Sequence, residues 1–134
     1  MAAPIVVTGA TGFIGTALVP ALRAAGHPVT ALTRDAERAR RVLGDATCVT
    51  ADLQSPGPWT SALAGAAAIV HLAGAPIAGQ RWDARYKQRL RDSRVETTRT
   101  LVEAIAALPA ASRPRALIAS SGIDYYPFAP DGRA

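Results

Sequence analysis

The stretch "TGATGFIG", residues 8–15, decides the fold, because it follows a short apolar run and precedes an amphipathic segment. Its glycines, Gly9, Gly12 and Gly15, recur at every third position. Between a strand and a helix, such glycines allow a positive φ, close approach of a phosphate to the main chain, and tight helix–strand packing. The helix start also offers unbonded N–H groups and about half a positive charge to an anion. The stretch predicts a cradle for the pyrophosphate of a dinucleotide, with a tight turn that binds nothing as the alternative.

Apolar runs alternate with helical patterns along the chain, which is typical of a parallel sheet built from βαβ units. Strands are expected at residues 5–8, 29–33, 47–51, 68–72 and 116–120. Helices are expected at residues 12–25, 35–43, 59–64 and 82–108. Right-handed crossovers then give a Rossmann-like, doubly wound α/β sheet of strand order 3-2-1-4-5. Its switch point lies between strands one and four, where such sheets bind ligands beyond the carboxyl ends of the strands.

The composition limits the classes of partner. A chain of 134 residues suits one domain with a sizeable core. The net charge is +5, and seven basic residues fall between Arg81 and Arg99. This cluster indicates a solvated helix face, with attraction to an anionic ligand as the alternative. Because no aromatic residues interleave with the basic ones in a known module, no nucleic-acid partner is expected.

Residues 53–80 need a separate check as a membrane span, because they contain no Asp, Glu, Lys or Arg. Prolines, glycines and His71 interrupt this stretch, which favours a short helix, a buried strand and a loop. The first residues run into an apolar strand without a basic leader. We therefore expect a soluble, cytoplasmic protein with no membrane partner.

The end of the second strand distinguishes two cofactors. An acid there would hold the ribose 2′-hydroxyl of NAD, whereas an arginine accommodates the 2′-phosphate of NADP. The chain has Arg34 followed by Asp35. Asp35 is suited to cap the next helix, which leaves Arg34, with Arg38 nearby, for a phosphate. The sequence favours NADP, with NAD as the alternative.

No other cofactor chemistry is indicated. No lysine follows the glycines, so the stretch is not a P-loop. No metal site is expected. Asp52 and Leu53, just past the third strand, lie where an adenine ring would sit, and a simple turn cap is the alternative for that pair.

Three segments carry a family resemblance. "TGATGFIG", "ADL" at residues 51–53 and "VHLAGAPI" at residues 70–77 resemble the extended short-chain dehydrogenase/reductases, the NAD(P)-dependent epimerase/dehydratase group. "HLAGAPIAGQRW" followed by "RDSRVETTRTLVEAI" resembles an atypical epimerase-like subgroup of unproven substrate. The resemblance covers almost the whole chain. It implies an NAD(P)-binding Rossmann domain at residues 1–121 and, at residues 122–134, the start of a loop toward a C-terminal substrate portion.

The resemblance also implies site residues. Gly9, Gly12 and Gly15 would hold the pyrophosphate, while Ala73 and Gly74 would line the nicotinamide side. Together with the reasoning above, the expected cofactor-binding residues are Thr8, Gly9, Thr11, Gly12, Phe13, Ile14, Gly15, Arg34, Asp52, Leu53, Ala73 and Gly74.

At the end of the fifth strand, Ser121, with Ser120 beside it, matches a family serine that polarises a substrate carbonyl or hydroxyl. A loop hydroxyl bonded to its own backbone is the alternative. His71 matches a frequent histidine of strand four and is expected to be buried and satisfied rather than catalytic.

Two departures from the family pattern matter. Thr97 stands where the subgroup usually has glycine, and the only lysine, Lys87, precedes the fifth strand, so the family's Tyr-x-x-x-Lys pair is absent from this chain. Tyr125 and Tyr126 follow Ser121, but no neighbouring cation would tune either as a general base.

Two function hypotheses follow. Under the first, the chain is part of an NADP-dependent oxidoreductase or epimerase-like enzyme. Its substrate would be a small carbonyl compound or alcohol, either free or linked to a nucleotide. The second is a non-catalytic dinucleotide sensor, and the oligomeric state stays open under both.

Overall fold

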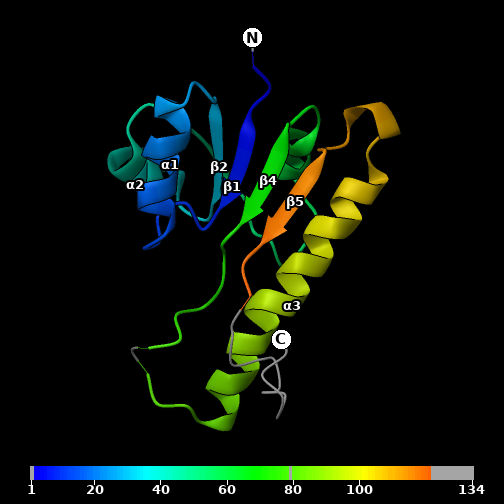
Figure 1. Cartoon of the computed structure of the whole chain (residues 1–134). Coiled ribbons are helices and arrows are strands. Elements are labelled where there is room, and N and C mark those ends of the chain that lie inside the picture. Colours follow the sequence, from blue (N-terminus) through cyan, green and yellow to red (C-terminus); the bar gives the residue numbers. More distant parts are fainter. Residues whose placement is uncertain (1, 79, 122–134) are drawn as a thin grey trace, which may run out of the picture.

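The sheet has the strand order expected from the sequence. The computed structural model describes residues 2–78 and 80–121. Within them a five-stranded, wholly parallel sheet runs in the order β3-β2-β1-β4-β5 (Figure 1). The strands are β1 Ile5–Thr8, β2 Val29–Thr33, β3 Thr47–Thr50, β4 Ala68–His71 and β5 Ala116–Ala119. The predicted Rossmann-like α/β class and strand order are therefore confirmed. The expected loop at residues 122–134 lies outside the described residues.

Helices cover both faces of this sheet. The α-helices are α1 Gly15–Ala24, α2 Ala36–Leu43 and α3 Ala84–Ala107, and two short 3₁₀ helices are η1 Pro58–Leu63 and η2 Ala110–Ser112. Figure 1 shows α1 and α2 on one side of the sheet and the long α3 on the other. This layering buries both sides of the central strands, which explains why β1 is a continuous apolar run.

Two aspartates set where α2 and α3 begin. The Asp35 carboxylate accepts a hydrogen bond from Arg38 N at 2.9 Å, and that of Asp83 accepts one from Tyr86 N at 2.7 Å. Both are N-caps, which satisfy main-chain donors that have no partner within the helix. The periodicity predicted a helix that starts at residue 82. Because Asp83 is the cap, α3 instead begins at Ala84. The proposed capping role of Asp35 is confirmed.

The core forms two clusters, one on each face of the sheet. Val6 of β1 packs among Trp59 and Leu63 of η1 and Leu101 of α3. The next residue, Val7, packs on the opposite face against α1 and α2. Side chains of a strand alternate between its faces, so two neighbouring valines anchor both layers.

All five strands point the same way, so their carboxyl ends meet at one edge of the sheet, the lower edge in Figure 1. β1 lies between β2 and β4, with Thr8 opposite Leu32 on one side and His71 on the other. The chain leaves β1 toward α1 on one face and leaves β4 toward α3 on the other. The predicted switch point is therefore at the ends of β1 and β4, and most of the expected site residues follow these strands.

Candidate functional site

Two of the three glycines in the β1–α1 turn are needed by the fold itself. Gly9 has φ +66°, and a Cβ there would lie 2.7 Å from both Ala73 N and Leu72 C. A Cβ on the buried Gly15 would lie 2.4 Å from Ala10 O, so this glycine lets α1 begin directly against the end of β1. Real Cβ atoms do not approach main-chain atoms this closely, and both positions require glycine.

Gly12 differs from its two neighbours in the motif. It is exposed, and a Cβ on it would approach only Gly9 O, at 3.2 Å, within the same turn. Gly12 N donates to Gly9 O at 3.0 Å, which closes the turn. The outer flank of Gly12 is open, and this is the flank by which a phosphate would approach the main chain.

The turn also presents unbonded donors. In the part of the chain that the structure describes, the main-chain N–H groups of Phe13, Ile14 and Gly15 have no hydrogen-bond acceptor. They stand at the start of α1, where the aligned peptide dipoles add about half a positive charge. No acidic side chain lies in the first turn of α1 to compete for these donors. The arrangement fits an anionic group such as a pyrophosphate.

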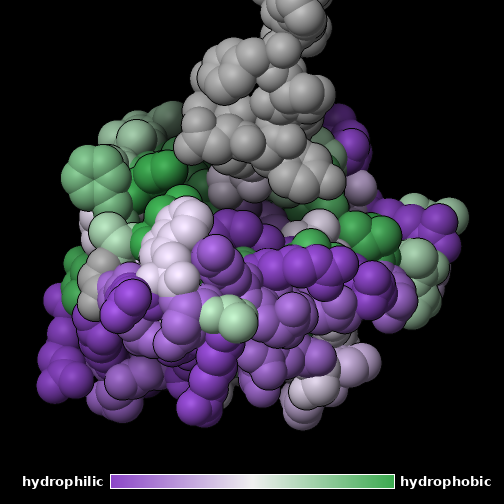
Figure 2. Space-filling view, turned by 90° about the horizontal axis from the view of Figure 1, so that it is seen from below, coloured by the Kyte–Doolittle hydropathy of each residue, from purple (hydrophilic) through white to green (hydrophobic). Residues whose placement is uncertain are grey.

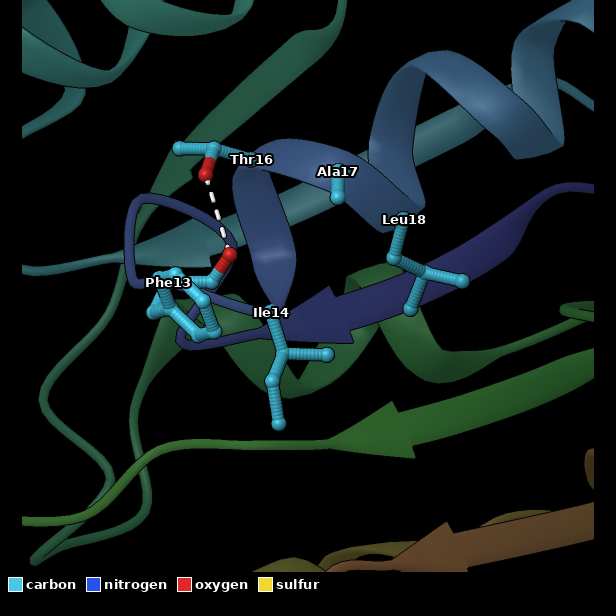
Figure 3. Close-up of a pocket in the computed structure, with 5 residues that line it drawn as sticks. All are labelled: Phe13, Ile14, Thr16, Ala17 and Leu18. Carbon is cyan, nitrogen blue, oxygen red and sulfur yellow. Dashed lines mark hydrogen bonds between the residues drawn. The ribbon is translucent and has the colours of Figure 1, made fainter.

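Two of these donors belong to residues with exposed apolar side chains. Phe13 is 97% exposed and Ile14 is 57% exposed, although both are large and hydrophobic. Together with α1 they line an open hollow, drawn in Figure 3, whose residues are Phe13, Ile14, Thr16, Ala17 and Leu18. The Thr16 hydroxyl lies 3.0 Å from Gly12 O and 3.2 Å from Phe13 O and so supports the turn from the helix side. Thr11, between the glycines, is half-buried.

An exposed guanidinium follows the end of β2. Arg34 is exposed and makes no ion pair with any described residue. The neighbouring Asp35 carboxylate is occupied by Arg38 N, as described above. An anion at this strand end would meet the Arg34 guanidinium, because the Asp35 carboxylate is already hydrogen-bonded to Arg38 N.

The end of β3 offers less to a ligand. Asp52 is exposed, and its carboxylate accepts a hydrogen bond from Gln54 N at 3.0 Å, which is the turn-capping role weighed from the sequence. Leu53 is 8% exposed and belongs to the core cluster with Trp59 and Leu63. Leu53 therefore supports this corner of the site mainly by filling the core beneath it.

Thr8 contributes to the site through its neighbours. It is 0% exposed, and its hydroxyl oxygen accepts hydrogen bonds from Leu72 N and Ala73 N, each at 3.2 Å. The same oxygen lies 2.7 Å from Nδ1 of His71. The predicted buried and satisfied state of His71 is confirmed, since it is 4% exposed. Burial lowers the pKa of His71 below its ordinary value of 6.5.

Arg94 of α3 is a site residue that the sequence reasoning missed. Its Cζ lies 3.1 Å from where a Cβ of Gly74 would stand, so glycine at 74 makes room for the guanidinium. The guanidinium donates to Ala75 O at 3.1 Å and to Leu90 O at 3.2 Å. The only sequence signal was the motif "RDSRVETTRTLVEAI", which does not show that Arg94 packs on Gly74. The result is a positive group beside the end of β4.

The loop after β4 is held by side chains of α3 and of the residues just before it. Ser93 Oγ accepts from Ala75 N at 2.8 Å, and Trp82 Nε1 donates to Ile77 O at 2.8 Å. The Tyr86 hydroxyl donates to Pro76 O. In Figure 1 this loop descends from β4 to the lower end of α3. These hydrogen bonds tie the first part of the loop, at Ala75, Pro76 and Ile77, to α3 and to Trp82 just before it.

Ser121 lies two residues beyond the end of β5. The last register pair of β4 and β5 is His71 with Ala119, so Ser121 lies past the carboxyl ends of both strands. Ser121 is exposed, and Ser120 N donates to His71 O at 3.2 Å. The structure therefore brings the expected catalytic serine to the same edge as the glycine turn. Tyr125 and Tyr126 lie outside the described residues.

The face that carries this edge mixes two kinds of surface. Figure 2, which views the molecule from below, shows hydrophobic residues gathered in its upper part and hydrophilic residues across its lower part.

Among residues 2–78 and 80–121, no group of three or more His, Cys, Asp or Glu side chains could hold a metal ion. None of the described helices is long and apolar enough to cross a membrane.

The comparisons with known proteins agree with this geometry. Residues 5–131 match the NAD dependent epimerase/dehydratase family. The chain is 39% identical over 124 residues to the epimerase family protein SDR39U1 of Bos taurus, covering 91% of this chain and 37% of that protein. It is 36% identical over 120 residues to the chloroplastic SDR39U1 homologue of Arabidopsis thaliana, covering 90% of this chain and 34% of that protein. The chain thus spans little more than a third of the length of these relatives.

Solved structures give the same assignment. Human epimerase family protein SDR39U1 with NADPH superposes with a TM-score of 0.66 at 33% identity, covering 92% of this chain and 38% of that one. MoeE5 in complex with UDP-glucuronic acid and NAD superposes with a TM-score of 0.64 at 31% identity, covering 88% of this chain and 36% of that one. This chain belongs to the NAD-dependent epimerase/dehydratase family.

Proposed function

We propose that this chain is the NADP-binding part of an enzyme that transfers a hydride between the cofactor and a carbonyl or alcohol, with a nucleotide-linked sugar as the substrate class. The observation that carries the proposal is the row of unbonded N–H groups at Phe13, Ile14 and Gly15 beside the open flank of Gly12. NADPH in the human relative and a UDP-sugar with NAD in MoeE5 support the cofactor and substrate classes.

Each part of the site has a role in this proposal. The turn donors bind the pyrophosphate, and the exposed Arg34 guanidinium binds the 2′-phosphate. Asp52 and Leu53 border the adenine. Ala73 and Gly74 border the nicotinamide, with Arg94 as a neighbouring positive group. The buried Thr8 shapes the turn without meeting the ligand, whereas Gly15 offers only its main-chain N–H.

The chemistry comes from the cofactor, which accepts or donates a hydride when bound. The chain's own part is to hold the dinucleotide at the switch point and to orient the substrate. Ser121 is the residue proposed to hold the substrate oxygen by a hydrogen bond, since it is exposed and follows β5 at the carboxyl edge of the sheet. This bond would favour the charge that develops on that oxygen during the transfer.

Titration of NADPH and NADH into the protein and its Arg34→Asp variant tests the proposal. A hydrogen bond to a charged group contributes about 1.5–3 kcal/mol, so the variant should bind NADPH roughly ten- to a hundredfold more weakly. Its affinity for NADH should be kept or improved. Arg85→Asp, which makes the same charge change at an exposed position of α3, should leave both affinities unchanged.

Three results would count against parts of the proposal. An unchanged NADPH preference in Arg34→Asp would remove the NADP assignment. Absence of binding of either dinucleotide to the wild-type protein would remove the cofactor site altogether. Binding without NADPH oxidation across a broad panel of carbonyl compounds would favour the non-catalytic sensor.

A further inference from the structure

His71 joins three elements at the switch point. Its Nδ1 lies 2.7 Å from the Thr8 hydroxyl at the end of β1, and its Nε2 lies 3.4 Å from the Thr97 hydroxyl of α3. His71 itself is the last residue of β4. The ring is therefore a bridge between the two central strands and the helix that covers them.

The hydrogen bonds around Thr8 assign the state of the ring. The Thr8 oxygen already accepts from Leu72 N and Ala73 N, so its own hydroxyl proton has to be donated elsewhere. Nδ1 of His71, at 2.7 Å, is the acceptor within reach. The ring proton then resides on Nε2, and the ring is neutral.

The Thr97 side completes the same pattern. The Thr97 hydroxyl donates to Ser93 O at 2.7 Å, which leaves its oxygen free to accept from Nε2–H of His71. In the series of hydrogen bonds from Thr8 through His71 and Thr97 to Ser93 O, each donated proton then has one acceptor. Thr97 thereby gives the buried ring a second partner.

This series of hydrogen bonds holds in place the main chain of Leu72 and Ala73, against which the glycine turn packs. Thr8 immediately precedes Gly9, and Gly9 packs against the main chain of Leu72 and Ala73. Leu72 N lies 3.2 Å from both the carbonyl oxygen and the hydroxyl oxygen of Thr8. A shift of the His71 ring would therefore move the contacts that hold the turn at the end of β4.

Protonation of His71 would break this arrangement. A proton on Nδ1 would face a Thr8 oxygen that already accepts two N–H groups, and the Thr8 hydroxyl would lose its acceptor. The ring's partners, Thr8 from β1 and Thr97 from α3, are uncharged, and β5 places Ala119 beside it in register. Burial of the ring penalises a charge that these neighbours do not offset.

We propose that His71 is a positioning residue for the cofactor site: its neutral ring, held between Thr8 and Thr97, keeps the glycine turn seated on β4, and loss of that neutral ring weakens dinucleotide binding. The proposal rests on the cofactor site proposed above. It assigns His71 no contact with the cofactor or the substrate.

The test compares the affinity for NADP⁺ at pH 8 and at the lowest pH at which the proteins stay folded, in the wild-type protein and two variants. His71→Asn keeps an acceptor toward Thr8 but cannot take up a proton, and His27→Asn removes an exposed histidine as a control. The 2′-phosphate of the ligand also titrates near pH 6, with a pKa of about 6, so the informative quantity is the difference between proteins.

On acidification, wild type and His27→Asn should lose affinity for NADP⁺ more steeply than His71→Asn does. Because one proton is involved, the difference between the proteins should be at most about tenfold per pH unit. A pH dependence that is the same in His71→Asn as in wild type would overturn the proposal.

A second readout needs no cofactor, so it separates this proposal from that of the NADP site. Hydrogen-exchange mass spectrometry at both pH values, corrected for intrinsic exchange, reports on the Leu72 and Ala73 amides that Thr8 holds. Their protection should fall at the lower pH in wild type and hold in His71→Asn. Equal protection in both proteins at both pH values would overturn the positioning role, even if the cofactor binds as proposed.

Discussion

The contact between Gly9 and the end of β4 can be tested by comparing Gly9 with Gly65. Both have positive φ angles, +66° and +73°, but a Cβ on Gly9 would lie 2.7 Å from main-chain atoms, whereas nothing lies within 4 Å at Gly65. Alanine at a positive φ costs about 1–2 kcal/mol, and forcing extra atoms into a packed site costs about 1–3 kcal/mol more. We expect Gly9→Ala to lower the free energy of unfolding by about 2–5 kcal/mol and Gly65→Ala by only about 1–2 kcal/mol.

Urea unfolding followed by circular dichroism measures both losses. The comparison is valid if the two variants keep the wild-type dependence of the unfolding free energy on urea, so that the midpoints report stability alone. A Gly9→Ala protein that fails to fold while Gly65→Ala folds would agree with the expectation. Equal losses in the two variants would refute the conclusion that the turn rests on the main chain of β4.

Three other predictions concern the core, the buried histidine and the proposed catalytic residue. Leu101→Ala removes a fully buried side chain and should lower the free energy of unfolding by about 2–5 kcal/mol, whereas the half-exposed Val102→Ala should change it by less than about 0.5 kcal/mol; urea unfolding checks both. Because burial lowers the pKa of His71 in the folded protein, the unfolded chain binds more protons below pH 6.5. Stability from this group should be complete above pH 6.5 and fall as the pH drops toward the folded-state pKa, by at most about 1.4 kcal/mol per pH unit, and His71→Asn should flatten the profile measured between pH 5 and 8. Ser121→Ala should lower the turnover of the complete enzyme by about a hundredfold with little change in NADPH affinity, and unaltered turnover would remove its proposed role.

The sheet was predictable because its signals are local. The apolar run of β1, the glycines after it and the alternation with helical segments are each read within a few residues, and crossover handedness then limits the possible strand orders to a few. The N-cap role of Asp35 was predictable for the same reason, since its partner Arg38 N is three residues away. Helix starts were placed less well. α1 begins at Gly15 rather than Gly12, because Gly12 N closes a turn onto Gly9 O before the helix begins.

The contacts that the sequence did not reveal join residues far apart in the chain. Arg94 reaches Ala75 across 19 positions, and Thr8 reaches His71 across 63. No spacing rule links such pairs, because the sheet brings them together only after it has formed. Thr8 was expected among the cofactor-binding residues, which stays a prediction; what the sequence did not reveal is that its hydroxyl oxygen accepts hydrogen bonds from Leu72 N and Ala73 N.

The most direct test of the central claim, that the glycine turn binds a nicotinamide dinucleotide, is a calorimetric titration of NADPH into the wild-type protein and its Gly12→Ala variant. A Cβ at Gly12 meets only Gly9 O, at 3.2 Å, so the variant should keep close to wild-type stability while the added methyl group obstructs the approach of the pyrophosphate. We expect the wild-type protein to bind NADPH and a stably folded Gly12→Ala variant to bind it at least about tenfold more weakly, a loss of about 1.4 kcal/mol. Equal affinity in the two proteins, or no binding by the wild-type protein, would contradict the account.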